Sequence, residues 1–257
     1  MSGRLANKVA IITGSGSGIG QAIAIRFATE GAIAVVDYRN HPEQANDTKA
    51  KCEAAGGKAI IVKADVSILA DTQTLVDETY KQLGRCDILV NNAGIEIRSD
   101  FWDVTEKDYD AVLNVNLKGA FFLTQAFVRR LRDAKLPGRI INISSVHEDM
   151  AFPHFSTYSV SKGGMRMLTH NLAVELGPLG ITVNNIAPGA IATPINTNLL
   201  DNKSELDALL VNIPLGRVGT PDDVSGLALF LASDDGDYVT GSTYVIDGGL
   251  MRNYHEQ

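Results

Sequence analysis

The segment Val9-Ala10-Ile11-Ile12-Thr13-Gly14-Ser15-Gly16-Ser17-Gly18-Ile19-Gly20 decides the fold of this chain. Its apolar start predicts a buried strand, and its glycines allow a tight turn that can approach a ligand closely. A helix is expected to follow the turn, and a helix N-terminus offers free N–H donors to a phosphate group. A strand, a glycine-rich turn and a helix in this order are typical of a dinucleotide site.

The glycine spacing departs from the usual G-x-G-x-x-G, because Ile19 stands where the third glycine would fall if the pattern began at Gly14. The spacing present is Thr13-Gly14-x-x-x-Gly18-x-Gly20. We expect the turn to bind the pyrophosphate of a dinucleotide through five residues, namely Gly14, Ser17, Gly18, Ile19 and Gly20.

Short apolar runs alternate with longer amphipathic stretches along the rest of the chain. Near-continuous apolar runs are typical of strands that are covered on both faces. We expect strands at Val9–Thr13, Ile33–Tyr38, Ala59–Lys63, Ile88–Asn91, Arg139–Ser144, Thr182–Ala187 and Thr243–Ile246. We expect helices at Ile19–Thr29, Glu43–Ala55, Ala70–Leu83, Glu106–Ala134, Thr157–Leu176 and Pro221–Leu231.

This alternation predicts an α/β fold with one doubly wound parallel sheet and helices on both faces. No linker or composition shift divides the chain, so we expect a single domain over residues 1–257. Its cofactor-binding half would cover about 1–135, and its catalytic and substrate-loop part about 136–257. The least regular stretch is Pro188–Pro214, and a long loop of this kind is often an active-site lid.

Composition narrows the function classes. Hydrophobic residues are 45% of the chain and charged residues 21%, which excludes wholesale disorder. The formal charge of −7 disfavours nucleic acid as the main partner, because phosphate-backbone binding needs a basic surplus. No apolar run approaches the roughly 18 residues of a membrane span, so we expect a cytoplasmic protein. Cys52 and Cys86 have neither metal-ligand spacing nor a disulfide framework.

The second predicted strand ends in Asp37-Tyr38-Arg39, where a dinucleotide would place its adenine ribose. A carboxylate there would bind the ribose 2′-hydroxyl of NAD, whereas an arginine would pair with the 2′-phosphate of NADP. Both residue types are present, so these residues alone leave the choice of cofactor open.

Tyr158 and Lys162 stand four residues apart in a predicted helix, so they share one helix face. An ammonium group beside a phenol favours the phenolate, which lets a tyrosine exchange a proton near neutral pH. Ser145 ends a buried strand shortly before them, and ligands bind at the carboxyl edge of a parallel sheet.

Five ordered motifs together resemble the short-chain dehydrogenase/reductase family: Thr13-Gly14-x-x-x-Gly18-x-Gly20, Asn91-Asn92-Ala93-Gly94, Ser145, Tyr158-x-x-x-Lys162 and Pro188-Gly189. The resemblance implies a Rossmann-type domain, NAD or NADP as cofactor, chemistry without a metal, and a homotetramer. A surplus of apolar residues on two long helices agrees with subunit pairing there: Phe121, Phe122, Phe127, Met165, Met167 and Leu168.

The resemblance also implies roles for individual residues. Tyr158 would be the general acid/base, and Lys162 would lower its pKa and hold the nicotinamide ribose. Ser145 would hydrogen-bond the reacting oxygen, and Asn116 would order a proton-relay water. Further cofactor contacts would come from the ends of the third, fourth and sixth strands: Asp65, Val66, Asn92, Ala93, Gly94, Pro188, Gly189, Ile191 and Thr193.

The family pattern also bears on cofactor choice. In strictly NAD-dependent members the acid usually falls where Tyr38 stands, and Arg39 follows as in many NADP-using members. Strand alternation puts Asp37 and Tyr38 on opposite faces, so only one can point into the ribose pocket, and the resemblance implies Tyr38. We therefore expect NADP as the preferred cofactor, with NAD also accepted.

A narrower resemblance is to the bacterial glucose 1-dehydrogenases, through Ser144-Ser145-Val146-His147-Glu148, Ser161-Lys162-Gly163-Gly164-Met165 and Asn91-Asn92-Ala93-Gly94-Ile95-Glu96. It implies hydride transfer between the nicotinamide and a sugar or polyol. The expected substrate contacts are Glu96, Ser145, His147, Tyr158 and Asn196, with Glu148 as a further polar group.

Other functions stay open. A 3-oxoacyl-[acyl carrier protein] reductase would use Arg129 and Arg130 against its acidic carrier, although Gly177-Pro178-Leu179-Gly180 lacks a basic residue often found there in such reductases. Gluconate and other polyol dehydrogenases fit the same chemistry. A nucleotide-sensing binding protein would not need the full set of Ser145, Tyr158, Lys162 and Asn116, so the sequence favours catalysis.

Overall fold

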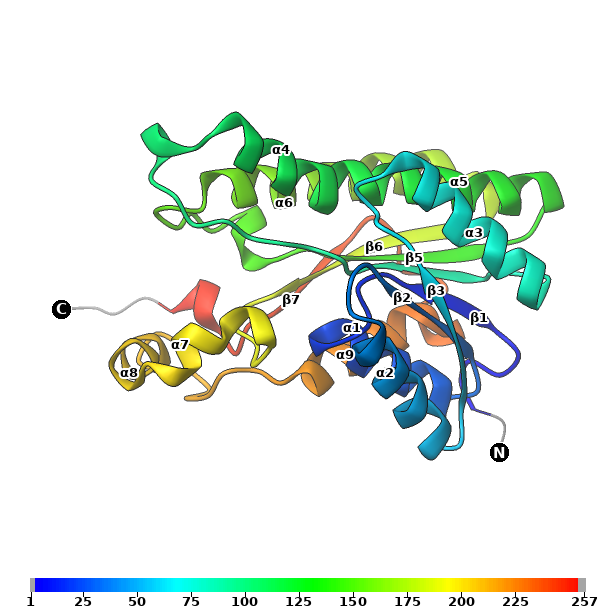
Figure 1. The fold of residues 1–257 in the computed structure, drawn as a ribbon, viewed down its shortest axis with the longest axis horizontal. Helices are drawn as coiled ribbons and strands as arrows, with labels where there is room; N and C mark the ends of the chain where they lie inside the picture. Colours follow the sequence, from blue (N-terminus) through cyan, green and yellow to red (C-terminus); the bar gives the residue numbers. More distant parts are fainter. Residues whose placement is uncertain (1–2, 254–257) are drawn as a thin grey trace.

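The computed structural model describes residues 3–253, which form one seven-stranded sheet whose paired strands all run parallel (Figure 1). The strands lie in the order β3-β2-β1-β4-β5-β6-β7. Their bounds are β1 Val9–Ile12, β2 Ile33–Tyr38, β3 Lys58–Lys63, β4 Ile88–Asn91, β5 Gly138–Ile143, β6 Ile181–Pro188 and β7 Thr243–Ile246. Because the order reverses between β1 and β4, a ligand crevice is expected outside their carboxyl ends.

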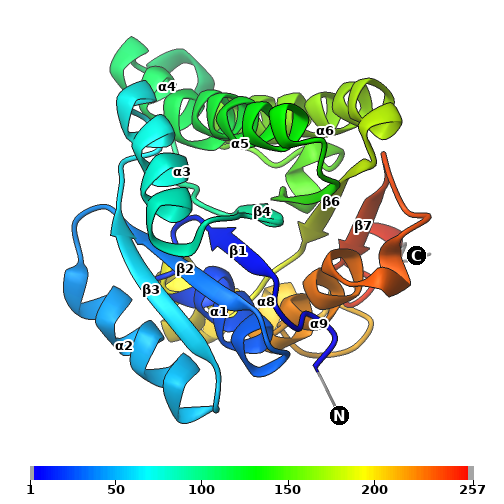
Figure 2. The same cartoon turned by 90° about the vertical axis from the view of Figure 1, so that its right-hand side faces the viewer.

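Helices cover both faces of the sheet (Figure 2). On one face lie α1 (Gly18–Thr29), α2 (Pro42–Ala54) and α9 (Pro221–Ala232). On the other lie α3 (Leu69–Leu83), α4 (Glu106–Leu113), α5 (Ala120–Ala134) and α6 (Ser156–Leu176). The side chains of β1 alternate between the two faces of the sheet. Ala10 and Ile12 belong to the buried apolar cluster on one face, and Val9 and Ile11 to the cluster on the other.

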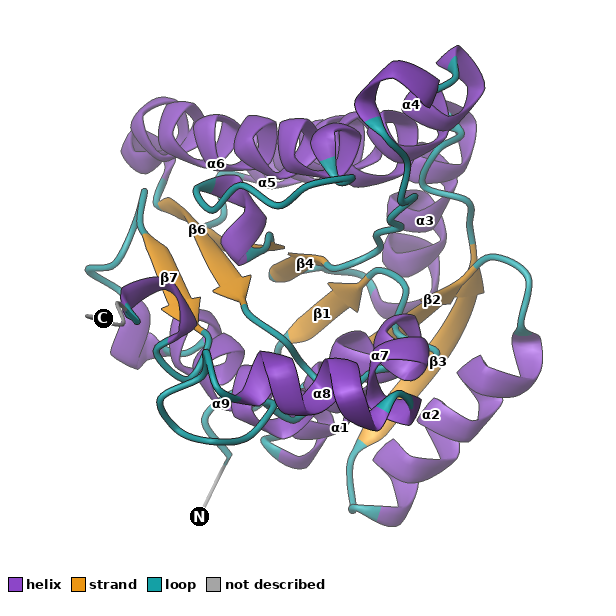
Figure 3. Cartoon of the chain, turned by 90° about the vertical axis from the view of Figure 1, so that its left-hand side faces the viewer, coloured by secondary structure: helices purple, strands orange, loops and turns teal. Residues whose placement is uncertain are grey.

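The predicted doubly wound sheet is confirmed, and the observed strands lie within about one residue of their expected bounds. Two parts differ from expectation. The stretch expected as one helix over Glu106–Ala134 contains a six-residue π-helix, η2 (Asn114–Gly119), between α4 and α5. The stretch Pro188–Pro214 is not a plain loop, because it contains α7 (Thr197–Asp201) and α8 (Lys203–Leu210). Figure 3 shows these two short helices at the end of the molecule toward which β6 and β7 run.

Glu106–Ala134 is also the one helical stretch among the described residues that is long and apolar enough, by length and composition alone, to cross a membrane. Half of its most apolar window is buried inside the protein. Its three parts pack against α3, α6 and the central strands, which is the arrangement of a core helix.

Candidate active site

The glycine-rich turn is tied to the end of β4 by one hydroxyl group. Thr13 Oγ1 accepts hydrogen bonds from the backbone N–H groups of Asn92 and Ala93, both at 2.9 Å. The Asn92 side-chain amide donates back to the Thr13 carbonyl at 2.8 Å. Thr13 and Asn92 therefore hold together the two strand ends at which the sheet order reverses.

Gly14 and Gly20 illustrate why the turn requires glycine. Gly14 has a φ of +60°, which residues with a side chain rarely adopt. A Cβ at Gly20 would lie 2.5 Å from Asn92 Nδ2 and 2.8 Å from the Gly14 carbonyl oxygen, so only glycine lets α1 approach the turn. The resulting cradle has its backbone exposed to a ligand.

The start of α1 fits the pyrophosphate of a dinucleotide. Its N-cap residue, Ser17, makes no side-chain capping bond, and its first turn carries no acidic residue. The N–H groups of this turn and the positive end of the helix dipole are thus available to an anion. Thr193 lies beside Gly18, with its Cγ2 3.4 Å from the place of a Cβ there, so the segment after β6 packs against the turn.

The end of β2 forms the adenosine end of the cradle. Asp37, not Tyr38, faces the glycine-rich turn: its Oδ2 accepts from the Gly14 N–H at 3.1 Å, whereas Tyr38 packs against the apolar cluster on the α1 side. Asp37 is buried beneath the turn, and the contact of Tyr38 with the adenine ribose stays a prediction. Asp37 Oδ1 is buried without a hydrogen-bond partner, and burial raises the pKa of Asp37 to about 7. Arg39 is half-exposed nearby, with Nη1 3.9 Å from Asp65 Oδ2.

Ser145, Tyr158 and Lys162 meet at the carboxyl end of β5. Lys162 is buried, its Nζ donates to the Ile143 carbonyl at 2.9 Å, and it lies 5.4 Å from the centre of the Tyr158 ring. Ser145 lies within hydrogen-bonding reach of the Tyr158 hydroxyl. A Cβ added at Gly94 would stand 3.7 Å from Lys162 Nζ, which puts the loop after β4 against the same group.

The pKa of Tyr158 is raised, which corrects the expectation that Lys162 lowers it in this structure. Burial is the main cause, the Glu96 carboxylate adds to it, and the hydrogen bond with Ser145 opposes both. Burial also lowers the pKa of Lys162 to about 8, while the carboxylates of Glu148 and Glu96 raise it. Desolvation is therefore the largest cause of the pKa shift in both groups.

Asn116 lies in the π-helix, and its side chain is fully buried. Its Oδ1 accepts from the Ile95 N–H at 2.8 Å, and its Nδ2 donates to the Ile95 carbonyl at 2.9 Å and to Ser161 Oγ at 3.1 Å. The amide thus links the loop after β4 to α6, and both of its N–H groups are bonded to protein. Short π-helices are frequent at functional sites.

The predicted substrate residues divide into two groups. Glu96 and His147 lie at the site: Glu96 is half-buried near Tyr158 and Lys162, and the His147 ring meets the Tyr158 ring edge-on at 5.3 Å. Asn196 instead donates from Nδ2 to the Ile191 carbonyl at 2.7 Å, so its amide holds its own loop.

His147 belongs to an aromatic wall beside Tyr158. Its ring stacks on Phe152 with centres 4.4 Å apart and lies 5.4 Å from Phe155. Burial lowers the pKa of His147 to about 4, so the imidazole is neutral near pH 7. The wall therefore offers a neutral, largely apolar surface to a substrate.

Several predicted cofactor residues occupy structural positions at the rim. A Cβ at Gly189 would come within 2.7 Å of Asp247 Cβ, so β6 leaves the sheet in close contact with the end of β7. Ile191 is buried and pairs with Gly219 through a bridge. Val66 is buried, and its carbonyl contacts the π-helix at Gly119. Pro188 ends β6 at the same edge.

Glu148, which we expected as a further polar group near the substrate, is buried instead. Its side chain is 1% exposed, and Oε2 accepts from Asn185 Nδ2 at 2.9 Å. Asn142 and Asn185 are also buried inside strands, and this cluster was not foreseen. The available signal was two polar residues inside otherwise apolar strands.

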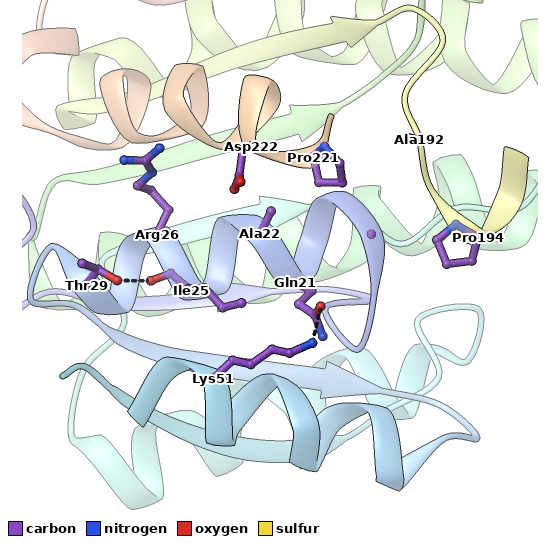
Figure 4. A pocket seen from close by; sticks show the side chains of 11 residues that line it. Gln21, Ala22, Ile25, Arg26, Thr29, Lys51, Ala192, Pro194, Pro221 and Asp222 are labelled. Carbon is purple, nitrogen blue, oxygen red and sulfur yellow. Dashed lines mark hydrogen bonds between the residues drawn. The ribbon is translucent and has the colours of Figure 1, made fainter. Parts of the chain in front are cut away.

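A groove of about 590 Å³ runs along the outer side of α1, between α9 and the segment after β6 (Figure 4). Figure 4 shows Arg26, Lys51 and Asp222 along it. It adjoins the glycine-rich turn at Gly18, but Ser145, Tyr158 and Lys162 do not line it. This groove is therefore separate from the candidate active site.

Known proteins resemble the chain over nearly its whole length. A family model described as enoyl-(acyl carrier protein) reductase matches residues 14–251. The chain is 44% identical to 3beta-hydroxysteroid dehydrogenase 1 of Eggerthella lenta, over 96% of the chain and 94% of that protein. It is 38% identical to glucose 1-dehydrogenase 2 of Bacillus subtilis, over 96% and 95%. The crystal structure of a gluconate 5-dehydrogenase from Burkholderia cenocepacia in complex with NADP and tartrate has a TM-score of 0.92 and 38% identity, covering 98% of each chain.

Proposed function

The chain belongs to the short-chain dehydrogenase/reductase family, and from this premise we propose that it interconverts a sugar or polyol hydroxyl and the matching carbonyl. It is an NAD(P)-dependent oxidoreductase that acts on hydroxyl groups. The observation that carries the proposal is the meeting of Ser145, Tyr158 and the buried Lys162 at the carboxyl edge of the sheet.

The proposed mechanism assigns one task to each of these side chains. In the oxidative direction the Tyr158 phenolate takes the proton of the substrate hydroxyl while Ser145 donates a hydrogen bond to the same oxygen. A bound nicotinamide supplies the acceptor for the hydride that leaves the carbon. The Lys162 ammonium offsets the phenolate charge, and Asn116 keeps the loop after β4 in place.

Sugar specificity is supported by relatives and by the polar side of the pocket. The relatives include a glucose 1-dehydrogenase and a gluconate 5-dehydrogenase. Glu96 adds a half-buried carboxylate that can accept hydrogen bonds from substrate hydroxyls. The test is a panel of aldoses, aldonates and polyols with NAD and NADP, followed by the absorbance of the reduced cofactor. Turnover of none of them would overturn the proposal.

A 3β-hydroxysteroid is the second candidate substrate. It is favoured by the aromatic wall of His147, Phe152 and Phe155 beside Tyr158 and by the 44% identity to a hydroxysteroid dehydrogenase. Including such a steroid in the panel separates the two candidates. The carrier-protein reductase is less well supported, because Arg130 is already paired with Asp77 at 2.6 Å.

NADP is the proposed preferred cofactor, and Arg39→Ala tests that preference. If Arg39 binds the 2′-phosphate, its loss removes charge-assisted bonds of roughly 1.5–3 kcal/mol. The KM for NADP should then rise by about ten- to a hundredfold, whereas the KM for NAD should change little. Steady-state kinetics with both cofactors at fixed ionic strength measure this, with the exposed Arg129→Ala on α5 as control. Equal changes for both cofactors would contradict the assignment.

We propose a cytoplasmic homotetramer. Four large apolar side chains on α5 and α6 are exposed in the single chain, and a subunit interface would cover them: Phe121, Val160, Met167 and Val174. Light scattering at micromolar concentration should give four times the chain mass of 27.5 kDa. A monomer mass under these conditions would refute the assembly.

A further inference from the structure

A chain of buried side-chain hydrogen bonds crosses the sheet next to the active site. Asn91 Nδ2 on β4 donates to Asn142 Oδ1 on β5 at 2.8 Å, and Asn142 Nδ2 donates to Thr169 Oγ1 on α6 at 2.8 Å. Thr169 donates to Asn185 Oδ1 on β6 at 2.9 Å, and Asn185 Nδ2 donates to Glu148 Oε2 at 2.9 Å. We call these five residues the polar ladder.

Every donor in the polar ladder points toward Glu148, whose carboxylate is the final acceptor. The first four side chains are nearly inaccessible, and that of Glu148 is 1% exposed. Hydrogen bonds in a buried chain polarise one another, and losing its last acceptor would leave the Asn185 amide unsatisfied. The ladder therefore needs an acceptor at position 148, but it does not by itself need a charge there.

Position 148 also connects the ladder to the reacting groups. Glu148 ends the short 3₁₀ turn η3 (Val146–Glu148), and its N–H donates to the Ser145 carbonyl at 3.0 Å. The His147 N–H in the same turn donates to Ser145 Oγ at 3.2 Å. Anchoring Glu148 thus fixes the turn that presents Ser145 and His147.

The charged groups around Glu148 come from the turn and from α6. Lys162 and Arg166 on α6 are cationic, with Arg166 Nε 3.8 Å from Glu148 Oε1, while Asp149 adds a negative charge. His147 is neutral near pH 7, and Ser144 and Thr243 bring only hydroxyl groups. Lys162 is faced by two carboxylates, Glu148 and Glu96 from the loop after β4.

We propose that Glu148 is a positioning residue for the reaction: its buried carboxylate anchors the turn that carries Ser145 and places a negative charge beside the face of α6 that carries Lys162 and Arg166. The inference rests on the proposed oxidoreductase function of this site. The Glu148 side chain has no route to the substrate, because Asn185, Arg166 and the neighbouring hydroxyls surround it.

Glu148→Gln separates charge from anchoring, because the amide oxygen can still accept from Asn185. Removing the negative charge of Glu148 lowers the pKa of the neighbouring Lys162 ammonium. The pH profile of kcat/KM should therefore shift to lower pH by about one unit, while the melting temperature changes little. Glu148→Asp should restore the wild-type profile in part, and Glu148→Ala should also lower the melting temperature.

The exposed Glu175→Gln on α6 is the matched control, and its pH profile should superpose on that of the wild type. An NMR titration of the lysine Cε signals measures the pKa of Lys162 without turnover. The Lys162 signal is assigned as the one that disappears in Lys162→Met. The Lys162 signal should titrate at lower pH in Glu148→Gln than in the wild type. Absence of turnover in the wild type would count against the proposed function alone. An unshifted Lys162 titration in Glu148→Gln would overturn the role of Glu148.

Discussion

Tyr158→Phe should lower kcat by about 10²–10⁴-fold, because the variant keeps the aromatic ring but removes the proton that the reaction exchanges. The ring packs edge-on against His147 and lies next to Lys162, so the shape of the pocket is retained. Cofactor binding should be largely unaffected. Steady-state kinetics and a cofactor titration by fluorescence measure the two quantities on the same preparation.

Tyr109→Phe is the matched control, since Tyr109 lies exposed on α4 and should tolerate the same change. Because the pKa of Tyr158 is raised, the oxidation rate of the wild type should depend on pH in one direction. Oxidation needs the phenolate, so its rate should increase with pH through neutrality. Near-normal turnover by Tyr158→Phe would remove the tyrosine from the mechanism.

Gly20→Ala should raise the Kd for the dinucleotide at least about tenfold and lower the free energy of unfolding by about 1–3 kcal/mol. The added methyl group would lie 2.5 Å from Asn92 Nδ2 and 2.9 Å from Ser15 Cα, so α1 must move away from the turn. That movement carries the free N–H groups of the helix away from the phosphates. Calorimetric binding and chemical denaturation measure the two effects.

Gly226→Ala in α9 provides the opposite control. A Cβ at Gly226 meets nothing within 4 Å, and alanine favours a helix interior by about 0.5–1 kcal/mol. This variant should bind the dinucleotide normally and unfold at higher denaturant concentration. If Gly20→Ala also bound the dinucleotide with unchanged affinity, the turn would not be the pyrophosphate site.

The sheet could be predicted from the sequence because strands buried on both faces produce apolar runs such as Ile33–Tyr38, which were found at their expected places. The helices α7 and α8 were missed, because Thr197–Asp201 and Lys203–Leu210 are short and lie in a stretch rich in proline and polar residues. Motif spacing was sufficient to predict that Ser145, Tyr158 and Lys162 lie close together, because the ends of parallel strands and the starts of the following helices lie at one edge of the sheet.

Side-chain environments were harder to predict. The pKa of Tyr158 is governed by burial rather than by Lys162, and a sequence pattern reports which charges are near but not how much water is removed. The burial of Glu148 had no sequence signal of its own, because a carboxylate next to a histidine fits a substrate pocket equally well. Asp37 shows the same limit, because its burial beneath the glycine-rich turn has no signal in the sequence.

The π-helix between α4 and α5 limits which insertions and deletions this stretch of the chain can accept. A π-helix closes i→i+5 hydrogen bonds and so contains about one residue more than the α-helical stretch it replaces. That residue rotates everything after it by about 100° about the helix axis. That rotation lets α4 pack on α6 while α5 packs on α3. Deleting one residue between Asn114 and Gly119 would give a continuous α-helix, but the apolar face of α5 would then be rotated away from α3. The length of this stretch is therefore fixed by geometry even where the identity of a residue is not.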